Sequence, residues 1–235
     1  MKILITKINN TLISKFGVPK RNSSETDSVD ALIATILSQN TTDKNSYKAY
    51  QNLKTNFKNW KEVASAKQNI IEQNIRVGGL AKQKAKSIKT ILNRLQKQKG
   101  KITLDYLKEL PNDEAVSELV KFNGVGVKTA SCVLLFSLNR NVCPVDTHVH
   151  RTANRIGLVK TKSPDKTFEI INENLPEGVA HSFHTNLIML GRDICKSGKP
   201  LCTICPLLKT CAYKEKNMLP VSKMTKNNFL LLDNV

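Results

Sequence analysis

Two helices joined by a glycine-containing turn constrain the fold of this chain more than any other stretch. The segment is residues 119–146, LVKFNGVGVKTASCVLLFSLNRNVCPVD. Apolar residues recur at helical spacing before it, Gly124 and Gly126 interrupt the pattern, and an almost wholly apolar helix is expected over residues 127 to about 138. A helix that is apolar on every side is buried in a core. The segment therefore predicts a helical hairpin whose second helix lies inside a helical domain.

Lys128 is the one charged residue of this expected second helix. It falls in the first turn, where the helix dipole and the unpaired backbone N–H groups favour an anion over a cation. The same N–H groups and the neighbouring glycines suit a phosphate. Three roles are open for the lysine: a phosphate contact, a neutral amine nucleophile, or a solvated residue of a purely structural hairpin.

Four cysteines have the spacing of a metal site. They form the array C-x6-C-x2-C-x5-C, made of Cys195, Cys202, Cys205 and Cys211. Four thiolates in one short loop can enclose a tetrahedral Zn²⁺ or a [4Fe–4S] cluster, and spacing alone leaves both open. We expect no export signal, because no basic segment precedes an apolar one, so metal ligation explains the cysteines better than disulfides do.

An excess of positive charge predicts a polyanionic partner. The chain has 37 Lys and Arg against 19 Asp and Glu, a formal net charge of +18. A basic ribosomal or chromatin protein would share this charge. Between residues 82 and 101 there is no acid, and the bases are Lys82, Lys84, Lys86, Lys89, Arg94, Lys97, Lys99 and Lys101. A solvated helix face is the ordinary role of such a run, but without acids and after a glycine turn it favours a surface that follows phosphates.

The hairpin and the loop after it resemble a known family. FNGVGVKTA followed by PVDTHVHR is similar to the helix-hairpin-helix and aspartate loop of DNA glycosylases of the endonuclease III family. The resemblance implies that Gly124 and Gly126 grip the DNA backbone, that Lys128 attacks the sugar and that Asp146 assists. A plain helix N-cap is the alternative role of Asp146, and both can hold at once. The hairpin departs from the family by opening Phe-Asn-Gly where Leu-Pro-Gly is usual.

The cysteine array also resembles this family. Its spacing is that of the iron–sulfur loop of endonuclease III, and the similarity extends into the flanking residues 191–192 and 213–216. The resemblance therefore implies a [4Fe–4S] cluster, rather than zinc, held by Cys195, Cys202, Cys205 and Cys211.

Two further segments carry residues that the resemblance assigns to DNA. In Ser-Gln-Asn-Thr-Thr-Asp, residues 38–43, Thr42 or the following aspartate can cap the next helix, but capping does not account for the two amides before it. The resemblance places Asn40 at the amide that enters the duplex where the damaged nucleotide leaves. It places Leu80, in GGLAKQKA, at the apolar wedge. Lys82 and Lys84, the first bases of the run described above, are expected to contact DNA. The family often has glutamine at position 40 and an aromatic residue at position 81, where this chain has Asn40 and Ala81.

These observations predict an all-α, two-lobed helix-hairpin-helix DNA glycosylase fold with a C-terminal [4Fe–4S] cluster loop. Residues 26–137 are expected to form a central lobe, and residues 1–25 with 138–216 a second lobe. Lys128 and Asp146 are then expected to meet in a groove between the lobes. The tail, residues 217–235, lies beyond the resemblance, and its apolar patch at residues 229–232 can dock on the body or bind a partner.

The expected function is a bifunctional base-excision-repair glycosylase with AP-lyase activity, which removes oxidised pyrimidines through a lysine Schiff base. A glycosylase for mismatched or deaminated bases and a non-catalytic helix-hairpin-helix DNA-binding protein are the alternatives. The expected partner is double-stranded DNA with damaged bases or abasic sites. No apolar run is long enough to span a bilayer. We expect an intracellular, DNA-associated protein, in the cytoplasm or nucleoid if its source is a prokaryote, and we expect it to be a monomer.

Overall fold

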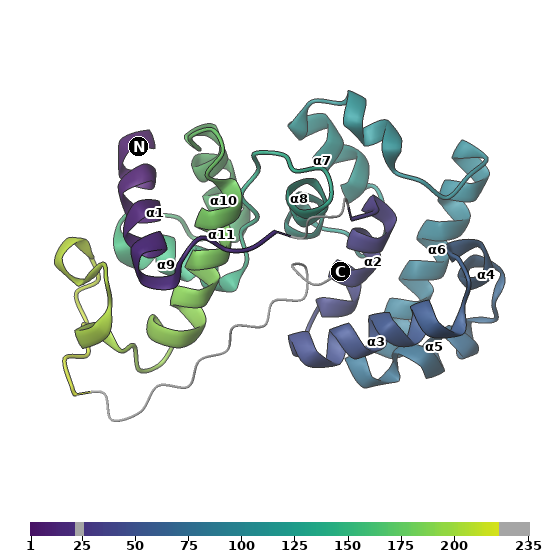
Figure 1. Ribbon diagram of the computed structural model, residues 1–235, viewed down its shortest axis with the longest axis horizontal. Coiled ribbons are helices and arrows are strands. Elements are labelled where there is room, and N and C mark those ends of the chain that lie inside the picture. The colour runs from purple at the N-terminus through teal and green to yellow at the C-terminus, as the bar shows by residue number, and fades with distance from the viewer. Residues whose placement is uncertain (22–25, 221–235) are drawn as a thin grey trace. The chain divides into compact units, whose positions relative to one another are not determined.

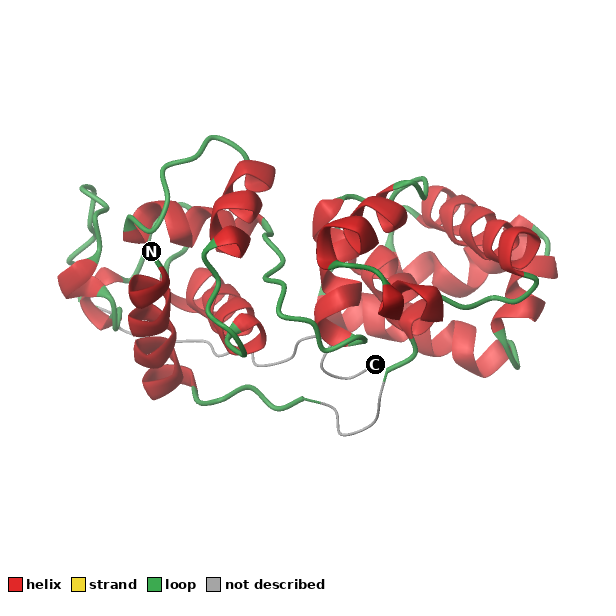
Figure 2. Cartoon of the chain, turned by 90° about the horizontal axis from the view of Figure 1, so that it is seen from above, coloured by secondary structure: helices red, strands yellow, loops and turns green. Residues whose placement is uncertain are grey.

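The described chain is built from helices alone. The computed structural model describes residues 1–21 and 26–220, and these contain α-helices, short 3₁₀ turns and one π turn but no strand (Figure 2). The expected all-α class is therefore confirmed. The apolar patch at residues 229–232 lies outside the described residues. Over the residues that are described, we find no helix with the length and apolarity needed to cross a bilayer.

The chain leaves one compact unit and returns to it. One unit contains residues 1–20 and 140–220, and the other contains residues 21 and 26–139 among those described. We refer to them as the terminal unit and the hairpin unit, and describe each by itself.

In the described part of the hairpin unit, eight helical segments precede the second helix of the hairpin. In chain order they are α2 (Ser28–Ser38), α3 (Asp43–Asn56), α4 (Trp60–Ser65), α5 (Gln68–Ile75), η1 (Arg76–Gly78), α6 (Ala81–Lys99), η2 (Asp105–Glu109) and α7 (Asn112–Val120), followed by α8 (Val127–Phe136) (Figure 1). Helix α2 packs on α3 and α8, and α6 packs on α4 and α5. The expected burial of the second hairpin helix is observed, since Ala130 and residues 132–135 are at most 1% exposed.

The terminal unit is organised around α11. Its helices are α1 (Lys2–Phe16), α9 (Thr147–Ile156), α10 (Pro164–Glu173) and α11 (Ala180–Met189), and η3 (Leu190–Ile194), η4 (Cys202–Ile204) and η5 (Leu208–Thr210) follow. Helix α1 packs on α11 although 163 residues separate the end of the first from the start of the second. Ile5, Ile8 and Leu12 form its buried face, and the Ser182 hydroxyl donates to Asn9 Oδ1 at 3.0 Å.

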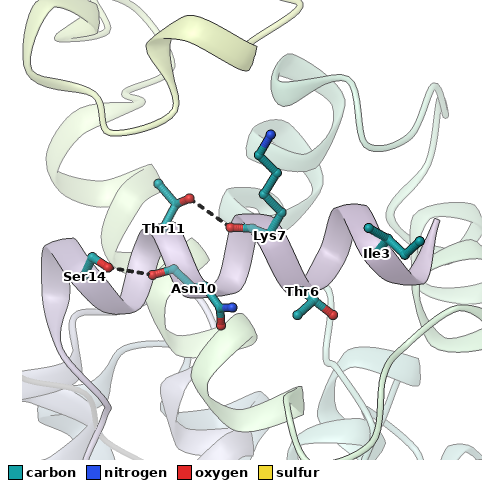
Figure 3. Close-up of a pocket in the computed structure, with 6 residues that line it drawn as sticks. All are labelled: Ile3, Thr6, Lys7, Asn10, Thr11 and Ser14. Carbon is teal, nitrogen blue, oxygen red and sulfur yellow. Dashed lines mark hydrogen bonds between the residues drawn. The ribbon is translucent and has the colours of Figure 1, made fainter.

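The outer face of α1 forms a shallow, open pocket. It is lined by Ile3, Thr6, Lys7, Asn10, Thr11 and Ser14 (Figure 3). The Thr11 and Ser14 hydroxyls donate to backbone oxygens one turn earlier in the same helix, at 2.8 and 3.0 Å. These groups are satisfied within α1, so the pocket offers no converging set of polar groups to a ligand.

The helix boundaries follow from local chemistry. Asp27 and Thr42 accept backbone N–H groups at the starts of α2 and α3, and Thr42 is thus one of the two caps that the sequence allowed. Gly157 ends α9 with φ +89°, a left-handed conformation that suits glycine. At these three boundaries a side-chain acceptor caps the first turn of a helix or a glycine adopts the left-handed backbone that ends one.

A polar cluster around Asp30 joins three helices of the hairpin unit. Trp60 Nε1 donates to Asp30 Oδ1 at 2.9 Å, and Lys54 Nζ lies 3.1 Å from the same oxygen and 5.1 Å from the Trp60 ring centre. Burial and the neighbouring Asp30 carboxylate raise the pKa of Tyr50 above its usual range. One partly buried carboxylate of α2 thus holds side chains from α3 and α4.

We predict that Asp30→Ala destabilises the hairpin unit by about 1–3 kcal/mol, because it leaves the Trp60 N–H and the Lys54 ammonium without their acceptor. Trp60 is the sole tryptophan of the chain, so its fluorescence during urea unfolding reports on this unit. Glu118→Ala, which removes an exposed ion pair with Lys121, should change stability by no more than about 0.5 kcal/mol. Equal effects of the two substitutions would contradict the structural role of the Asp30 cluster.

Candidate functional site

The turn between α7 and α8 depends on Gly124. Phe122 N–H donates to the Leu119 carbonyl at 3.0 Å, and Val125 N–H donates to the Phe122 carbonyl at 3.1 Å. Gly124 has φ +85°, and a Cβ added to it would lie 3.0 Å from Ser87 Oγ of α6. A side chain here would be strained by the backbone conformation and crowded by α6. The expected hairpin is therefore formed, with Gly124 pressed against the neighbouring helix.

Gly126 has a different reason to be glycine. Its φ is −99°, which other residues adopt readily, and a Cβ added to it would meet nothing within 4 Å. The protein's own packing therefore does not require glycine at this position. What the missing side chain provides is open space beside the N-terminus of α8, where a ligand can approach the backbone closely.

Lys128 lies in the first turn of α8, as expected. Gly126 is the N-cap residue and supplies no side-chain acceptor, and the first turn contains no acid. The N-terminus thus keeps N–H groups that no capping side chain satisfies and carries positive potential. Lys128 is half-buried at this end, whereas the helix beyond it is buried. The arrangement can bind an anionic group beside the lysine.

Asp146 is the N-cap of α9. Its Oδ1 accepts the Val149 N–H at 2.8 Å, so the structural role weighed from the sequence is present. Burial lowers the pKa of the neighbouring His148, against the opposing effect of the Asp146 carboxylate. Asp146 belongs to the terminal unit and Lys128 to the hairpin unit, and the expectation that the two meet at one site stays a prediction.

Asn40 and Leu80 share an uncommon backbone conformation. Their φ angles are +52° and +50°, and both residues are exposed, Leu80 by 51%. A residue such as leucine in the left-handed region is strained by about 1–3 kcal/mol and asparagine by less, and such strain concentrates at functional sites. Leu80 also exposes an apolar side chain at the start of α6. These are the two residues that the sequence assigned to probing the base stack.

Gln39 connects the turn that contains Asn40 with the hairpin. Its Nε2 donates to the Gly124 carbonyl at 3.1 Å and lies 3.4 Å from Thr129 Oγ1 of α8. The amide before Asn40, which capping did not account for, thus has a structural partner. Sequence patterns do not predict this bond, because the two residues are 85 positions apart.

Lys84 departs from expectation. It was expected to face DNA, but it is 2% exposed, and its Nζ donates to the Leu37 carbonyl at 2.8 Å and the Gly78 carbonyl at 2.9 Å. Burial lowers its pKa to about 8. The expectation of a phosphate contact at Lys84 is therefore wrong for this structure, because the ammonium is enclosed by backbone carbonyls.

Other bases of the run on α6 also interact within the protein. Lys89 Nζ donates to the carbonyls of Ala64 and Ala66 at the end of α4. Arg94 donates to the Lys121 carbonyl at 2.8 Å. Lys82 and Lys86 are exposed, and so are Lys97 and Lys101. The run thus divides between bases that hold helix ends together and bases that face solvent.

This division predicts which bases contribute to the salt dependence of DNA binding. Lys86→Ala should reduce the magnitude of the negative slope of log Kobs against log [KCl] by about 0.9, because one phosphate contact is lost. Lys89→Ala should leave the slope unchanged and reduce the stability of the fold, since its amine binds carbonyls. Fluorescence anisotropy of labelled duplex DNA across a KCl titration measures the slope. A shallower slope for Lys89→Ala would show that the internal role assigned to it is incorrect.

The four cysteines of the C-terminal loop line one pocket. Cys195, Cys202, Cys205 and Cys211 face it together with apolar side chains of Ile194, Leu201 and Leu208. Burial is the main cause that raises the pKa of Cys205 to about 11, and the other three thiols add to it. Within residues 1–21 and 26–220 no three Cys, His, Asp or Glu side chains meet closely enough to form a metal site. The donors therefore share a pocket without converging on one point.

Arg155 of α9 holds this loop. Its Nη1 donates to the Lys196 carbonyl at 2.7 Å and lies 3.7 Å from Cys195 Sγ, and its guanidinium stacks 4.3 Å from the Tyr213 ring centre. Cys211 Sγ donates to the Arg155 carbonyl at 3.2 Å. Thiol donors, apolar walls and an N–H donor beside sulfur are the surroundings that an iron–sulfur cluster requires, so the residues present fit that group.

The fold and these residues define a class: an all-helical DNA glycosylase with a helix-hairpin-helix, a lysine at the start of its second helix and an aspartate at the next N-cap. Residues 33–177 match the family described as HhH-GPD superfamily base excision DNA repair protein. The chain belongs to this superfamily and, within it, to the endonuclease III family of DNA glycosylases and AP lyases.

Two relatives illustrate the similarity in sequence. Endonuclease III of Thermotoga maritima is 36% identical over 211 residues, which cover 89% of this chain and 93% of that protein. An Arabidopsis thaliana protein named "Putative DNA glycosylase" is 44% identical over 180 residues, which cover 76% of this chain and 61% of that protein. The chain thus spans about three fifths of the plant protein and nearly all of the bacterial one.

Solved structures agree with the sequence comparison. A non-covalent complex of endonuclease III with DNA has a TM-score of 0.75 and 28% identity, and covers 90% of this chain and 95% of that one. A thermostable thymine-DNA glycosylase, with a TM-score of 0.74 and 21% identity, shares the fold. The expected family, the glycosylase fold and the class of DNA-binding repair enzyme are therefore confirmed.

Proposed function

We propose that this protein is a bifunctional DNA glycosylase with AP-lyase activity, which removes oxidised pyrimidines from duplex DNA through a Schiff base on Lys128. The observation that carries the proposal is Lys128 in the uncapped first turn of α8, directly after the glycine turn. A trapped covalent intermediate of endonuclease III with DNA, at 28% identity and a TM-score of 0.75, supports a covalent mechanism.

The hairpin and the N-terminus of α8 bind the DNA backbone in this proposal. The open space at Gly126 lets a phosphate approach the N–H groups of the first turn, and no acid there opposes it. The exposed Lys82 and Lys86 add contacts to the backbone that do not depend on sequence. Binding at this point presents the sugar of a flipped nucleotide to Lys128.

The chemistry then proceeds in two stages. The neutral amine of Lys128 attacks C1′, the bond from C1′ to the base breaks, and the base leaves with its electron pair. Loss of the amine proton and opening of the sugar ring give a Schiff base at C1′. A proton is then removed from C2′, and the phosphate on C3′ leaves, which nicks the strand on the 3′ side.

Asp146 assists at the first stage. Its position as N-cap of α9 fixes the carboxylate through the Val149 N–H. We assign to it the removal of the lysine proton and the stabilisation of positive charge on the sugar. The strained, exposed Asn40 and Leu80 enter the space that the flipped nucleotide leaves in the duplex.

The substrate class is oxidised pyrimidines such as thymine glycol. Asn40 has a shorter side chain than glutamine, and Ala81 offers no ring for stacking, an interaction worth roughly 1–3 kcal/mol per base. The protein should therefore discriminate less strongly by the base opposite the lesion than a relative with both larger side chains does.

We predict that Lys128→Ala abolishes the covalent adduct that borohydride traps between the wild-type protein and thymine glycol duplex. The substitution removes the only amine that the proposal assigns to the Schiff base. Gel analysis of the adduct and of nicked abasic DNA in EDTA measures both stages. Lys121→Ala, which removes an exposed lysine seven residues away, serves as the matched control and should trap normally.

The same assay tests the substrate. Duplexes with thymine glycol, dihydrouracil, uracil, a G·T mismatch and an abasic site are compared. Cutting of the mismatch without cutting of thymine glycol would refute oxidised pyrimidines and leave the lysine chemistry standing. An adduct formed by Lys128→Ala would refute the role of the lysine.

The cysteine loop is the proposed site of a [4Fe–4S] cluster. Cys195, Cys202, Cys205 and Cys211 are the ligands, and the cluster, when bound, crosslinks the loop through its iron atoms. The exposed Lys196, Lys199 and Lys209 belong to the same loop, which would then present them in a fixed arrangement to phosphate. Arg155 holds the loop from α9 through the Lys196 carbonyl.

We predict that the purified protein is yellow-brown and contains about four iron atoms per chain. Cys202→Ser should lose iron and most of its soluble yield, because one missing ligand opens the loop. Cys143→Ser changes a buried cysteine outside the pocket and should keep its iron. Iron analysis and visible absorption after anaerobic purification provide the measurement. Colourless protein with stoichiometric zinc would overturn the cluster.

A further inference from the structure

Lys84 is a buried charge that the proposed reaction does not use. It lies on α6 among backbone carbonyls at 2% exposure, and no salt bridge joins it to a carboxylate in the part of the chain that the structure describes. Burying an ammonium is unfavourable, and an apolar side chain of similar length would fill the same space at a smaller cost. A buried lysine at this position therefore depends on the acceptors that surround its ammonium.

The two carbonyls that Lys84 binds belong to two separate segments. Leu37 lies in the last turn of α2, three residues before Asn40. Gly78 ends η1, two residues before Leu80. The backbone N–H of Lys84 also donates to the Leu80 carbonyl at 3.0 Å. One residue thus contacts the segments of both strained residues.

The two hydrogen bonds from the Lys84 ammonium reach carbonyls near the ends of helical segments, where few backbone hydrogen bonds hold the chain. The last carbonyls of a helix lack partners within that helix, and a cation placed there is favoured by the dipole. The Lys84 ammonium supplies such a partner to Leu37 and to Gly78 at once. A residue in the left-handed region persists only where its surroundings hold it. The hydrogen bonds from Lys84 hold the segments that lead into Asn40 and Leu80.

We propose that Lys84 is a positioning residue that holds the Asn40 and Leu80 segments in one fixed arrangement, so that both side chains enter the DNA stack together. The proposal rests on the proposed function for the roles of Asn40 and Leu80. Lys84 touches neither the DNA nor the reacting atoms, and acts through the two carbonyls. Gly78 packs against α3, where an added Cβ would lie 3.3 Å from Ala49 Cβ. The segment therefore has no room to move inward and compensate for the loss of the Lys84 hydrogen bond.

The test compares Lys84→Met with Lys61→Met, which removes an exposed lysine of α4 that has no role in the proposed DNA site. The first probe is a duplex with 2-aminopurine opposite a tetrahydrofuran abasic analogue, whose fluorescence rises when side chains disturb the stack. Wild type and Lys61→Met should give the full rise, and Lys84→Met should give little of it at saturating protein. This measurement needs binding only, so it remains informative if the protein proves to have no glycosylase or lyase activity.

The second probe separates positioning from general damage to the fold. For Lys84→Met, kcat/KM on thymine glycol duplex should fall roughly 10- to 100-fold. Nicking of a single-stranded abasic oligonucleotide, which has no stack to enter, should stay close to wild type. Equal losses on both substrates, or no loss on either, would overturn the proposal.

A double-mutant cycle with Leu80→Ala tests whether Lys84 acts through Leu80. Because the two substitutions would disable the same step, their effects on 2-aminopurine fluorescence should not add, and the double variant should resemble either single one. Additive effects would overturn the proposal. Should Lys84→Met lack a native circular dichroism spectrum, Lys84→Gln, which keeps N–H donors without the charge, takes its place in the cycle with the same criteria.

Discussion

The burial of helix α8 is the interaction on which the rest of the structure depends. Its apolar side chains fill the space between α2 and α7, and the Ser137 hydroxyl at its end donates to Ser28 Oγ at the start of α2. A buried helix has little freedom to shift, because protein interiors are close-packed. The first turn with the half-buried Lys128 is therefore carried on a fixed support. In the proposed function Lys128 attacks one sugar carbon, and this rigidity would keep it in position, since small misplacements of a nucleophile reduce the rate.

Basic side chains have two roles in this protein, one toward solvent and one within the fold, and the net charge of the chain does not distinguish them. Some bases of α6 face solvent, where they suit a polyanion, whereas Lys84, Lys89 and Arg94 donate to carbonyls at the ends of other segments. Helix ends have unpaired carbonyls and negative potential, so a long basic side chain can serve there as a C-terminal cap from another helix. Part of the positive charge that indicates a DNA partner thus stabilises the fold that binds the DNA.

The sequence predicted the structural features that depend on residues close to one another in the chain. The hairpin at Gly124, the cap at Thr42, the buried α8 and the all-α class follow from spacing and residue type within a few turns. It did not predict Lys84 or the bond from Gln39 to Gly124, because these join residues far apart in the chain. A basic residue on an amphipathic helix looks the same in sequence whether it meets phosphate or a carbonyl. The left-handed backbone at Leu80 was also beyond reach, since leucine rarely adopts it, whereas asparagine adopts it more readily.

The Gln39 side chain has a consequence for the spacing of two segments of the hairpin unit. It joins the turn before Asn40 directly to the Gly124 carbonyl of the hairpin, within one unit. In the proposed function the hairpin binds the DNA backbone and Asn40 enters the base stack. This bond would then set the distance along the duplex between the bound phosphate and the base pair that is probed.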